Sequence, residues 1–423
     1  MSARTIPILG GVLLLLAPFA GANEFSDLST YLAYAAEHNP GLMAADRRAD
    51  AASAAVGRAR ALPDPVLSVG YFAESVETRV GPQRQRWGIT QKLPWFGKRG
   101  LAAAVAQGSA DAARASGVDA RLALFFEIKH AYHERYAIQR AVAVTERGLR
   151  LVEELEQVVL TRYRTGQGTQ SAPLYLQIER KRLRDRLAEL ADRDEVEKAH
   201  LNALLGRPPD AELPPVAILP AVPEGMSPET LRRRLRGANP RLQALDARVD
   251  GAVAAERLAA RAFYPDVTVG LQYIDTGDAL DPRMTDSGKD PMVATLAVNL
   301  PIWIGAKRAA GEEARWRLEA TRHERRELEE RLLADLREAC FEFQSADRRV
   351  RLYRDELVPL AEQASEVTLR AFSGGEVDYR DVIEAERKLL DLELTLAQSE
   401  AARGRTWARI EMLTGAKGAG EGG

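Results

Sequence analysis

The chain contains the same structural unit twice, about 200 residues apart, and this duplication constrains its fold more than any other feature. The segment 93–99 (LPWFGKR) ends a strand-like stretch and opens a long helical pattern, and the segment 300–308 (LPIWIGAKR) does the same in the second half. Asn39-Pro40 and Asn239-Pro240 also correspond, and both predict a helix start, because Asn caps helices well and Pro is tolerated at the first helical position. Self-similarity over such a long period indicates two copies of a complete unit.

Each copy contains a predicted β-hairpin. We expect strands at about 65–74 and 86–93 in the first copy, and at about 265–274 and 292–300 in the second. Apolar and polar residues alternate along these stretches, so each strand has one apolar face.

A helical hairpin follows each β-hairpin, at 99–205 and 307–413. The first helix of each hairpin has roughly 65 residues and would span on the order of 100 Å, longer than a globular domain requires. Gly166 and Gly375 lie in the turns between the helices, and we expect Pro359 to kink the second long helix. The predicted unit is therefore helix, β-hairpin, long helix and return helix, and the predicted fold class is mainly α with a small β contribution.

The duplication divides the chain into five segments. They are a signal peptide, the first repeat, a proline-rich crossover, the second repeat and a flexible tail, at residues 1–22, 23–206, 207–228, 229–415 and 416–423. The signal peptide is predicted from a basic start, an apolar core and an A-x-A cleavage motif. The alternative, a membrane anchor, is less favoured because the apolar run is short.

Charge and composition argue against several classes of function. The formal net charge is −2, so nothing favours nucleic acid as a partner. Cys340 is the single cysteine, so the chain cannot form an intramolecular disulfide. After residue 22 the sequence has no apolar run of about 18 residues, so we expect any crossing of a membrane to be made by strands.

Four short strands require closure with other chains. An open sheet has two unpaired edges, and each unpaired backbone group costs several kcal/mol in lipid. Two copies of the chain would give eight strands and a filled barrel, whereas three copies would give twelve strands and an aqueous lumen. Polar residues on the expected inner face suit water, namely Ser68, Thr90, Thr268, Gln272, Thr295 and Asn299.

Aromatic and basic residues mark both junctions between strand and helix. Trp95 and Trp303 are candidates for an aromatic belt at a membrane interface, with core packing as the alternative. The basic residues that follow them are Lys98, Arg99, Lys307 and Arg308. Cations at a helix N-terminus oppose the helix dipole, so we expect lipid phosphates to offset this cost, with solvated side chains as the alternative.

With these features the chain resembles the TolC family of outer-membrane efflux channel proteins, the outer membrane factors of tripartite efflux systems. The resemblance rests on the order of several motifs, doubled at one period: the Asn-Pro helix starts, the strand pairs, the Leu-Pro segments and the turns around Gly166 and Gly375. It implies a homotrimer in the outer membrane that extends into the periplasm. In such a trimer a twelve-stranded β-barrel continues as a twelve-helix α-barrel, with an equatorial collar formed by the crossover and the termini.

The resemblance also assigns a role to the helical turns. In the family these turns form the periplasmic tip, where the adaptor (membrane fusion) protein of a tripartite pump docks. The matching residues are Arg162, Tyr163, Gly166, Phe372 and Gly375. The alternative is a plain turn that has no partner.

The family closes its tunnel near this tip with acidic residues of the second repeat, and Asp381 and Glu384 match those positions. A ring of carboxylates would favour cations, and a solvated acidic face is the alternative. Phe372 and Val377 lack the hydroxyl and the guanidinium that lock the gate in the best-known member. Those particular locks are therefore in doubt for this chain.

The sequence contains no catalytic constellation and no cofactor-binding motif. His130 and His133 have a helical spacing that would suit a metal ion, but histidines on a long helix are more often solvated or packed. We therefore expect no enzymatic activity, no cofactor and no metal site.

The sequence thus predicts a passive outer-membrane duct of a tripartite efflux pump, driven by an inner-membrane pump that the resemblance suggests is of the RND type. The form LPWFGKR is similar to that of members associated with heavy-metal efflux, which favours metal cations as cargo. A duct for type I protein secretion is one alternative. A soluble periplasmic coiled-coil scaffold is the rival from a different class.

Overall fold

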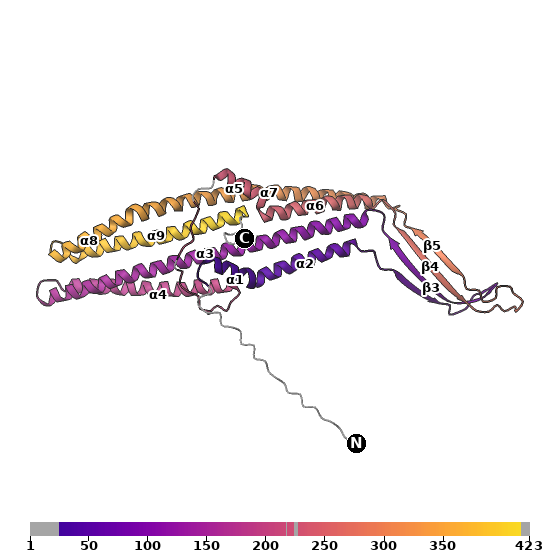
Figure 1. Cartoon of the computed structure of the whole chain (residues 1–423), viewed down its shortest axis with the longest axis horizontal. Helices are drawn as coiled ribbons and strands as arrows, with labels where there is room; N and C mark the ends of the chain where they lie inside the picture. Colours follow the sequence, from indigo (N-terminus) through magenta and orange to yellow (C-terminus); the bar gives the residue numbers. More distant parts are fainter. Residues whose placement is uncertain (1–24, 217, 224–226, 416–423) are drawn as a thin grey trace, which may run out of the picture. The chain divides into compact units, whose positions relative to one another are not determined.

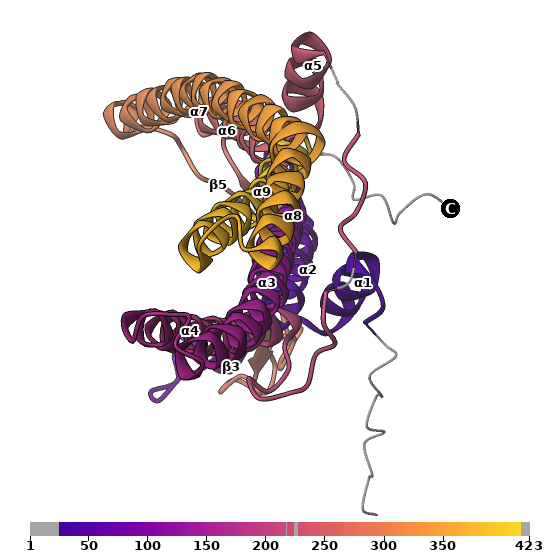
Figure 2. The same ribbon diagram turned by 90° about the vertical axis from the view of Figure 1, so that its left-hand side faces the viewer.

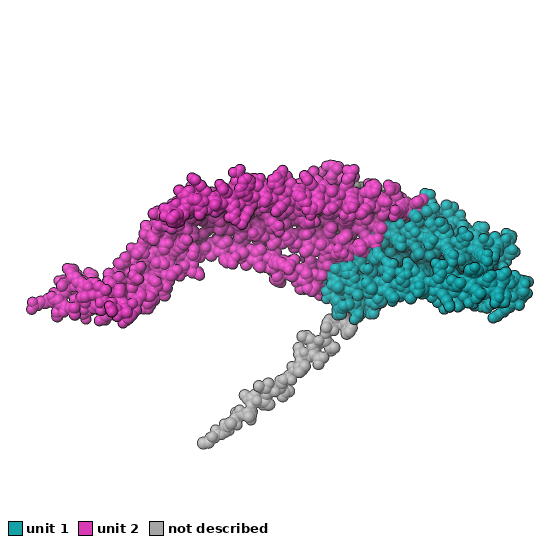
Figure 3. Space-filling view, turned by 180° about the vertical axis from the view of Figure 1, so that it is seen from behind, with its two compact units in different colours: residues 1–37, 131–221, 353–401 teal, residues 38–130, 222–352, 402–423 magenta. Residues whose placement is uncertain are grey.

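The structure is a computed structural model that describes residues 25–216, 218–223 and 227–415. The signal peptide predicted at 1–22 and the tail predicted at 416–423 lie outside the described residues. The chain divides into two compact units, which Figure 3 colours separately. Unit 1 comprises residues 1–37, 131–221 and 353–401, and unit 2 comprises residues 38–130, 222–352 and 402–423.

Unit 2 contains an antiparallel sheet and the helices that precede and follow its strands. The helices are α2 (Pro40–Arg60), the first part of α3 (Lys98–Arg164), α5 (Pro228–Ala238), α6 (Pro240–Arg261) and α7 (Ile304–Leu352). The strands are β1 (Val66–Tyr71), β2 (Glu77–Thr78), β3 (Gly81–Leu93), β4 (Val267–Thr276) and β5 (Met292–Val298).

Unit 1 consists of helices. They are α1 (Leu28–His38) apart from its last residue, the rest of α3, α4 (Ser171–Leu205), α8 (Val358–Gly374) and most of α9 (Tyr379–Thr414). In this unit α4 returns along α3 and α9 returns along α8, so two helical hairpins are formed (Figures 1 and 2). Among the described residues, no helix is long and apolar enough to cross a membrane.

The helix starts predicted at the two Asn-Pro pairs are confirmed. The Asn39 side chain accepts a hydrogen bond of 3.0 Å from the backbone N–H of Leu42 at the start of α2. The Asn239 side chain accepts from Arg241 and Leu242 at the start of α6. In both helices proline occupies the first position, where its missing N–H costs nothing.

The two repeats share one sheet, with the strand order β1-β3-β4-β5. The central pair joins β3 of the first repeat to β4 of the second, in the register Ile89 to Leu271 and Leu93 to Val267. Among the described residues, β1 pairs with β3 alone and β5 pairs with β4 alone. The sheet therefore has an unpaired edge on each side.

The first hairpin differs from the prediction, because β3 begins at Gly81 and not at residue 86. The added residues have few apolar side chains, so their alternation does not indicate a strand. They are in strand conformation because they pair with β4 as far as Thr276, and the two-residue β2 pairs with them on the other side. Pairing with a distant strand, which no local pattern shows, decides their structure.

A π-helical segment, Tyr353–Leu357, separates α7 from α8. It lies directly before Pro359, which has no N–H to donate and whose ring would collide with the carbonyl four residues earlier in a regular helix. A wider π turn accommodates both constraints. The kink that we expect at Pro359 thus corresponds to a local change of helix type.

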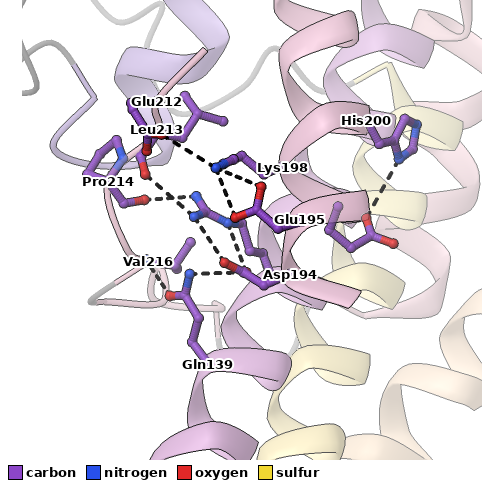
Figure 4. A network of polar contacts seen from close by, with 11 residues as sticks. Gln139, Asp194, Glu195, Lys198, His200, Glu212, Leu213, Pro214 and Val216 are labelled. Carbon is purple, nitrogen blue, oxygen red and sulfur yellow. Dashed lines mark hydrogen bonds and ion pairs between the residues drawn. The ribbon is translucent and has the colours of Figure 1, made fainter. Parts of the chain in front are cut away.

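The crossover is held against α3 and α4 by side chains of unit 1. Arg135, which is buried, forms an ion pair of 3.0 Å with Asp194 and donates 2.8 Å to the carbonyl of Pro214. The Gln139 side chain accepts from the backbone N–H of Val216, as Figure 4 shows. These contacts satisfy backbone groups of a proline-rich segment that has no regular secondary structure.

Candidate functional site

The two helical turns of unit 1 have the same backbone geometry. Gly166 and Gly375 have φ angles of 78° and 81°, in the left-handed region that favours glycine. Gly166 N–H donates to the Tyr163 carbonyl at 3.0 Å, and Gly375 N–H donates to the Phe372 carbonyl at 3.1 Å. In each turn the next residue donates to a carbonyl five positions earlier, which completes a Schellman motif.

Arg162 joins the two turns. Its guanidinium lies 4.5 Å from the centroid of the Phe372 ring and donates 3.3 Å to the Phe372 carbonyl. Phe372 is only 4% exposed and packs in a buried cluster with residues of both hairpins. Tyr163, in contrast, is exposed. Of the five predicted tip residues, the structure therefore brings Arg162 and Phe372 into contact and leaves the Tyr163 side chain on the surface.

Asp381 and Glu384 lie in the first turns of α9, and both side chains are exposed. The Asp381 carboxylate accepts a hydrogen bond of 3.0 Å from the backbone N–H of Asp378, just before the helix begins. This contact is half of a capping box, so Asp381 stabilises the start of α9. Any role of Asp381 in a gate must therefore be separated from its role as a cap.

A second link between the hairpins was not predicted from the sequence. Arg387 of α9 donates to Glu179 of α4 through two guanidinium nitrogens, the longer bond being 3.2 Å. The hydrogen bond to Glu179 raises the pKa of Arg387, although burial opposes the shift. The pair lines a groove of about 460 Å³ between α3, α4 and α9. Opposite charges at nearly equivalent positions after the two turn glycines are the sequence signal that would have indicated it.

The basic residues at the strand-to-helix junctions of unit 2 have protein partners. Arg99 donates to the carbonyl of Arg60 at 2.9 and 2.6 Å, where α2 ends. Lys307 donates 2.6 Å to the carbonyl of Ala262, where α6 ends. Because the C-terminus of a helix attracts cations, each side chain stabilises the neighbouring helix, whose C-terminus lies beside it. Phosphate contacts of these residues stay a prediction, and Arg308 is the most exposed of the four.

Lys98 stabilises the first strand-to-helix junction by binding Asp266. Its ammonium group lies 2.7 Å from the Asp266 carboxylate and 2.8 Å from the carbonyl of Tyr264. Burial raises the pKa of Asp266, but hydrogen bonds from Lys98, from the Trp95 backbone and from Lys92 outweigh burial and leave the pKa below its ordinary value. The junction thus contains an ion pair that joins the two repeats.

The two junction tryptophans differ in environment. The Trp95 ring stacks on Tyr264 with the ring centroids 5.8 Å apart, whereas Trp303 is 77% exposed. Phe96 is exposed as well. The first junction therefore packs its tryptophan against the protein, while the second presents its tryptophan outward.

The strand register separates the sheet into two faces. One face is apolar, and its large side chains are mostly exposed in the single chain: Leu67, Val69, Tyr71, Trp87, Ile89, Leu93, Val269, Leu271, Tyr273, Met292, Leu296 and Val298. The other face also contains Val66, Ile274 and Val293, but most of its residues are polar or small, and they include Ser68, Thr90, Thr268, Gln272 and Thr295, as predicted. An exposed apolar surface of this extent requires a cover of lipid or protein.

The histidine pair does not belong to a metal-binding group. Within the part of the chain that the structure describes, no cluster of three or more His, Cys, Asp or Glu side chains has metal-binding geometry. His130 lies near the ring of Phe126, and the buried His133 lies near the ring of Tyr132.

Comparisons with known proteins show which proteins this chain is similar to. Residues 231–416 match the family model described as outer membrane efflux protein. The matched segment lies in the second half of the chain, which is therefore similar to outer membrane efflux proteins.

Solved structures share the fold over nearly the whole chain. The CusC channel is 17% identical with a TM-score of 0.78, and the alignment covers 95% of this chain and 96% of CusC. The outer membrane protein VceC of Vibrio cholerae is 21% identical with a TM-score of 0.75, covering 92% and 96%. The MtrE outer membrane channel of Neisseria gonorrhoeae in its open state is 18% identical with a TM-score of 0.73, covering 92% and 88%. No curated protein sequence matches the chain.

Proposed function

We propose that this protein is an outer-membrane efflux channel of the TolC family and a homotrimer, in which three copies of the sheet close a twelve-stranded β-barrel that continues as a twelve-helix α-barrel. One observation carries the proposal: the sheet is unpaired at β1 and at β5 and presents an exposed apolar face. In lipid, strands are stable only when every edge is paired. Pairing β5 of one copy with β1 of the next satisfies both edges and turns the apolar face toward lipid.

The polar face argues for three copies. Two copies would give eight strands, whose interior is filled by side chains. The polar face of this sheet has glycine at residues 70, 88 and 270, which leaves its centre short of packing volume. Twelve strands, with an aqueous lumen, suit such a face better.

The same proposal extends to the partners. The hairpin turns are the periplasmic tip, and the exposed residues Tyr163, Gly166 and Gly375 lie on the surface on which a periplasmic adaptor docks. Arg162 and the buried Phe372 hold the two turns together beneath that surface. An inner-membrane pump, of the RND type, supplies the energy. Heavy-metal cations are the cargo that the form of the first junction segment favours.

Fractionation and mass together test the proposal against the soluble scaffold. We expect the protein in the outer membrane, with a detergent-solubilised mass of three chains and ion-conducting channels in planar bilayers. A periplasmic soluble extract that contains a monomer would contradict the proposal. A duct for type I protein secretion would use the same channel. Only the identity of the inner-membrane partner distinguishes such a duct from an efflux duct.

Asp381 and Glu384 are proposed as the constriction of the channel. Asp381→Asn keeps an acceptor for the Asp378 N–H, so with Glu384→Gln it removes charge while it preserves the cap. We expect the double variant to conduct more and to be less selective for cations than the wild-type channel. Conductance and selectivity that equal those of the wild type would remove both residues from the gate.

A further inference from the structure

Arg86 lies in the middle of β3, on the polar face of the sheet, and has no opposite charge across from it. Its cross-strand neighbours are Gly70 on β1 and Ile274 on β4. Directly opposite positions are those at which a carboxylate would compensate a cation in an antiparallel sheet. Neither neighbour has a side chain that accepts a hydrogen bond.

Within the described strands, the rest of this face has no carboxylate to offset Arg86. Between the junction and the β-bulge at 83–85, its residues in the described strands are Val66, Ser68, Gly70, Arg86, Gly88, Thr90, Lys92, Thr268, Gly270, Gln272, Ile274, Val293, Thr295 and Ala297. The second cation on it, Lys92, lies 3.3 Å from Asp266 at the junction. Arg86 therefore supplies the net charge of the face near the loop end of the sheet, since its partner Gly70 is the last residue but one of β1.

The glycines around Arg86 leave its guanidinium accessible. A Cβ at Gly70 would lie 3.8 Å from Arg86 Nε and 3.9 Å from Nη2, so the guanidinium extends across Gly70 along the sheet. Arg86 is exposed, and Gly88 adds no side chain beside it. A guanidinium presents several N–H donors in one plane, a geometry that suits carboxylates and phosphates.

We propose that Arg86 forms a ring of fixed cations that binds and favours anions inside the barrel. This inference rests on the proposed trimer, in which the polar face lines the lumen and symmetry repeats Arg86 three times. Rings of Arg or Lys are the usual determinants of anion preference in pores. The ring is opposite in sign to the acids at 381 and 384, so at the level of the barrel it raises the local concentration of ions that carry carboxylate or phosphate groups. It also lowers the local concentration of free metal cations, so it opposes the passage of the cargo proposed above without blocking a wide lumen.

The dimensions of the proposed barrel decide how far this charge acts. Twelve strands spaced about 4.8 Å apart and tilted by about 40° give a barrel roughly 24 Å across between backbones. Its axis then lies about 12 Å from the wall, close to one Debye length of about 10 Å at 0.1 M salt. The ring acts across the lumen at this salt concentration and is screened at 1 M.

Reversal potentials in planar bilayers under a KCl gradient test the proposal. Near 0.1 M KCl we expect Arg86→Gln to lower the chloride-to-potassium permeability ratio by about twofold, from three partly screened charges. Arg86→Lys keeps the charge and is expected to keep the wild-type ratio. At about 1 M KCl the difference between the Gln variant and the wild type should disappear.

Three results would overturn the inference: an unchanged ratio in Arg86→Gln, an equal fall in Arg86→Lys, or a shift that persists at high salt. A wild-type protein that forms no channel would contradict the proposed function as well. Channels of normal conductance with an unaltered ratio in Arg86→Gln would overturn this inference alone. Inorganic phosphate provides a second readout, because it should reduce the wild-type current at low salt more than the current of Arg86→Gln.

Discussion

Gly166 and Gly375 end their helices with positive φ angles, and nothing lies within 4 Å of a Cβ built at either position. A side chain at either position would therefore meet no neighbour and would destabilise the turn only through backbone strain, by roughly 1–2 kcal/mol for a residue in the left-handed conformation. The single residues that matter in unit 1 thus fall into two groups. The turn glycines act through the backbone, and Arg162, with Phe372, acts through a contact between the turns.

We predict that Gly166→Ala increases local opening of the first turn. A cost of 1–2 kcal/mol corresponds to roughly a 5- to 30-fold rise in the open population. The rate of limited proteolysis within residues 165–170 measures it. Gly168→Ala is the matched control, because its Cβ would lie no closer than 3.4 Å to any neighbour and its φ is not in the left-handed region. Equal cleavage rates in the two variants would contradict the role of the φ angle.

Tyr132 gives a pH-dependent prediction in the same unit. Burial, with smaller contributions from Tyr31 and Asp27, raises the pKa of Tyr132 to about 12. The folded state therefore favours the neutral phenol, whose hydroxyl donates 3.0 Å to the carbonyl of Ile218. Its contribution to stability is complete below pH 10 and is lost as the pH rises through about 12, up to roughly 2–3 kcal/mol.

Absorbance of tyrosinate during alkaline titration measures this shift. Tyr132→Phe should remove one tyrosine from the population that titrates near pH 12 and should reduce the loss of stability between pH 10 and 12. A titration curve identical to that of the wild type would show that Tyr132 ionises with the ordinary tyrosines.

At the scale of elements, α3 and α6 of unit 2 cross at two glycines. A Cβ at Gly108 would lie 2.6 Å from the Cα of Gly251 and 2.7 Å from the carbonyl of Ala247. These neighbours are backbone atoms, which cannot move without displacing a helix. The close crossing joins a helix of the first repeat to a helix of the second.

We predict that Gly108→Ala destabilises the helix pair by about 1–3 kcal/mol through overpacking. Gly117→Ala on the same helix is the control, because nothing lies within 4 Å of its Cβ, and alanine should stabilise the helix there by about 0.5–1 kcal/mol. Thermal unfolding of the purified protein should move in opposite directions for the two variants. A shift of the same sign in both would contradict the close crossing.

The sequence indicates much of this element structure, because local chemistry determines it. The Asn-Pro caps, the alternation in β4 and the turn glycines each have a local cause, and each is found in the structure. The early start of β3 and the π turn before Pro359 were not predicted in detail. The first depends on pairing with a strand distant in the sequence, and the second on how a long helix accommodates proline.

The candidate sites likewise contain some features that local sequence indicates and others that depend on distant partners. The turn residues and the junction residues could be located from motifs, because both lie where one element passes into another. Their partners could not be located, since Lys98, Arg99 and Lys307 bind groups that only the folded chain brings near. The Arg387–Glu179 pair had a sequence signal, because its opposite charges follow the two turn glycines at nearly equivalent positions, but that signal was not used.

At the scale of the whole molecule, the central claim is that three copies close one barrel. The sheet of one chain has a lipid-compatible face, a polar face and two unpaired edges, so it is incomplete alone. The similarity of residues 231–416 to outer membrane efflux proteins supports the proposal that the outer membrane is its location. The number of copies decides whether the polar face, with Arg86, encloses water.

Electron cryomicroscopy of the protein, purified from the outer membrane into lipid nanodiscs, tests this claim most directly. We expect three copies around one axis, with β5 of each copy paired with β1 of the next and the apolar face in contact with lipid. A closed ring of two copies, or a sheet whose β1 and β5 edges stay unpaired, would contradict it.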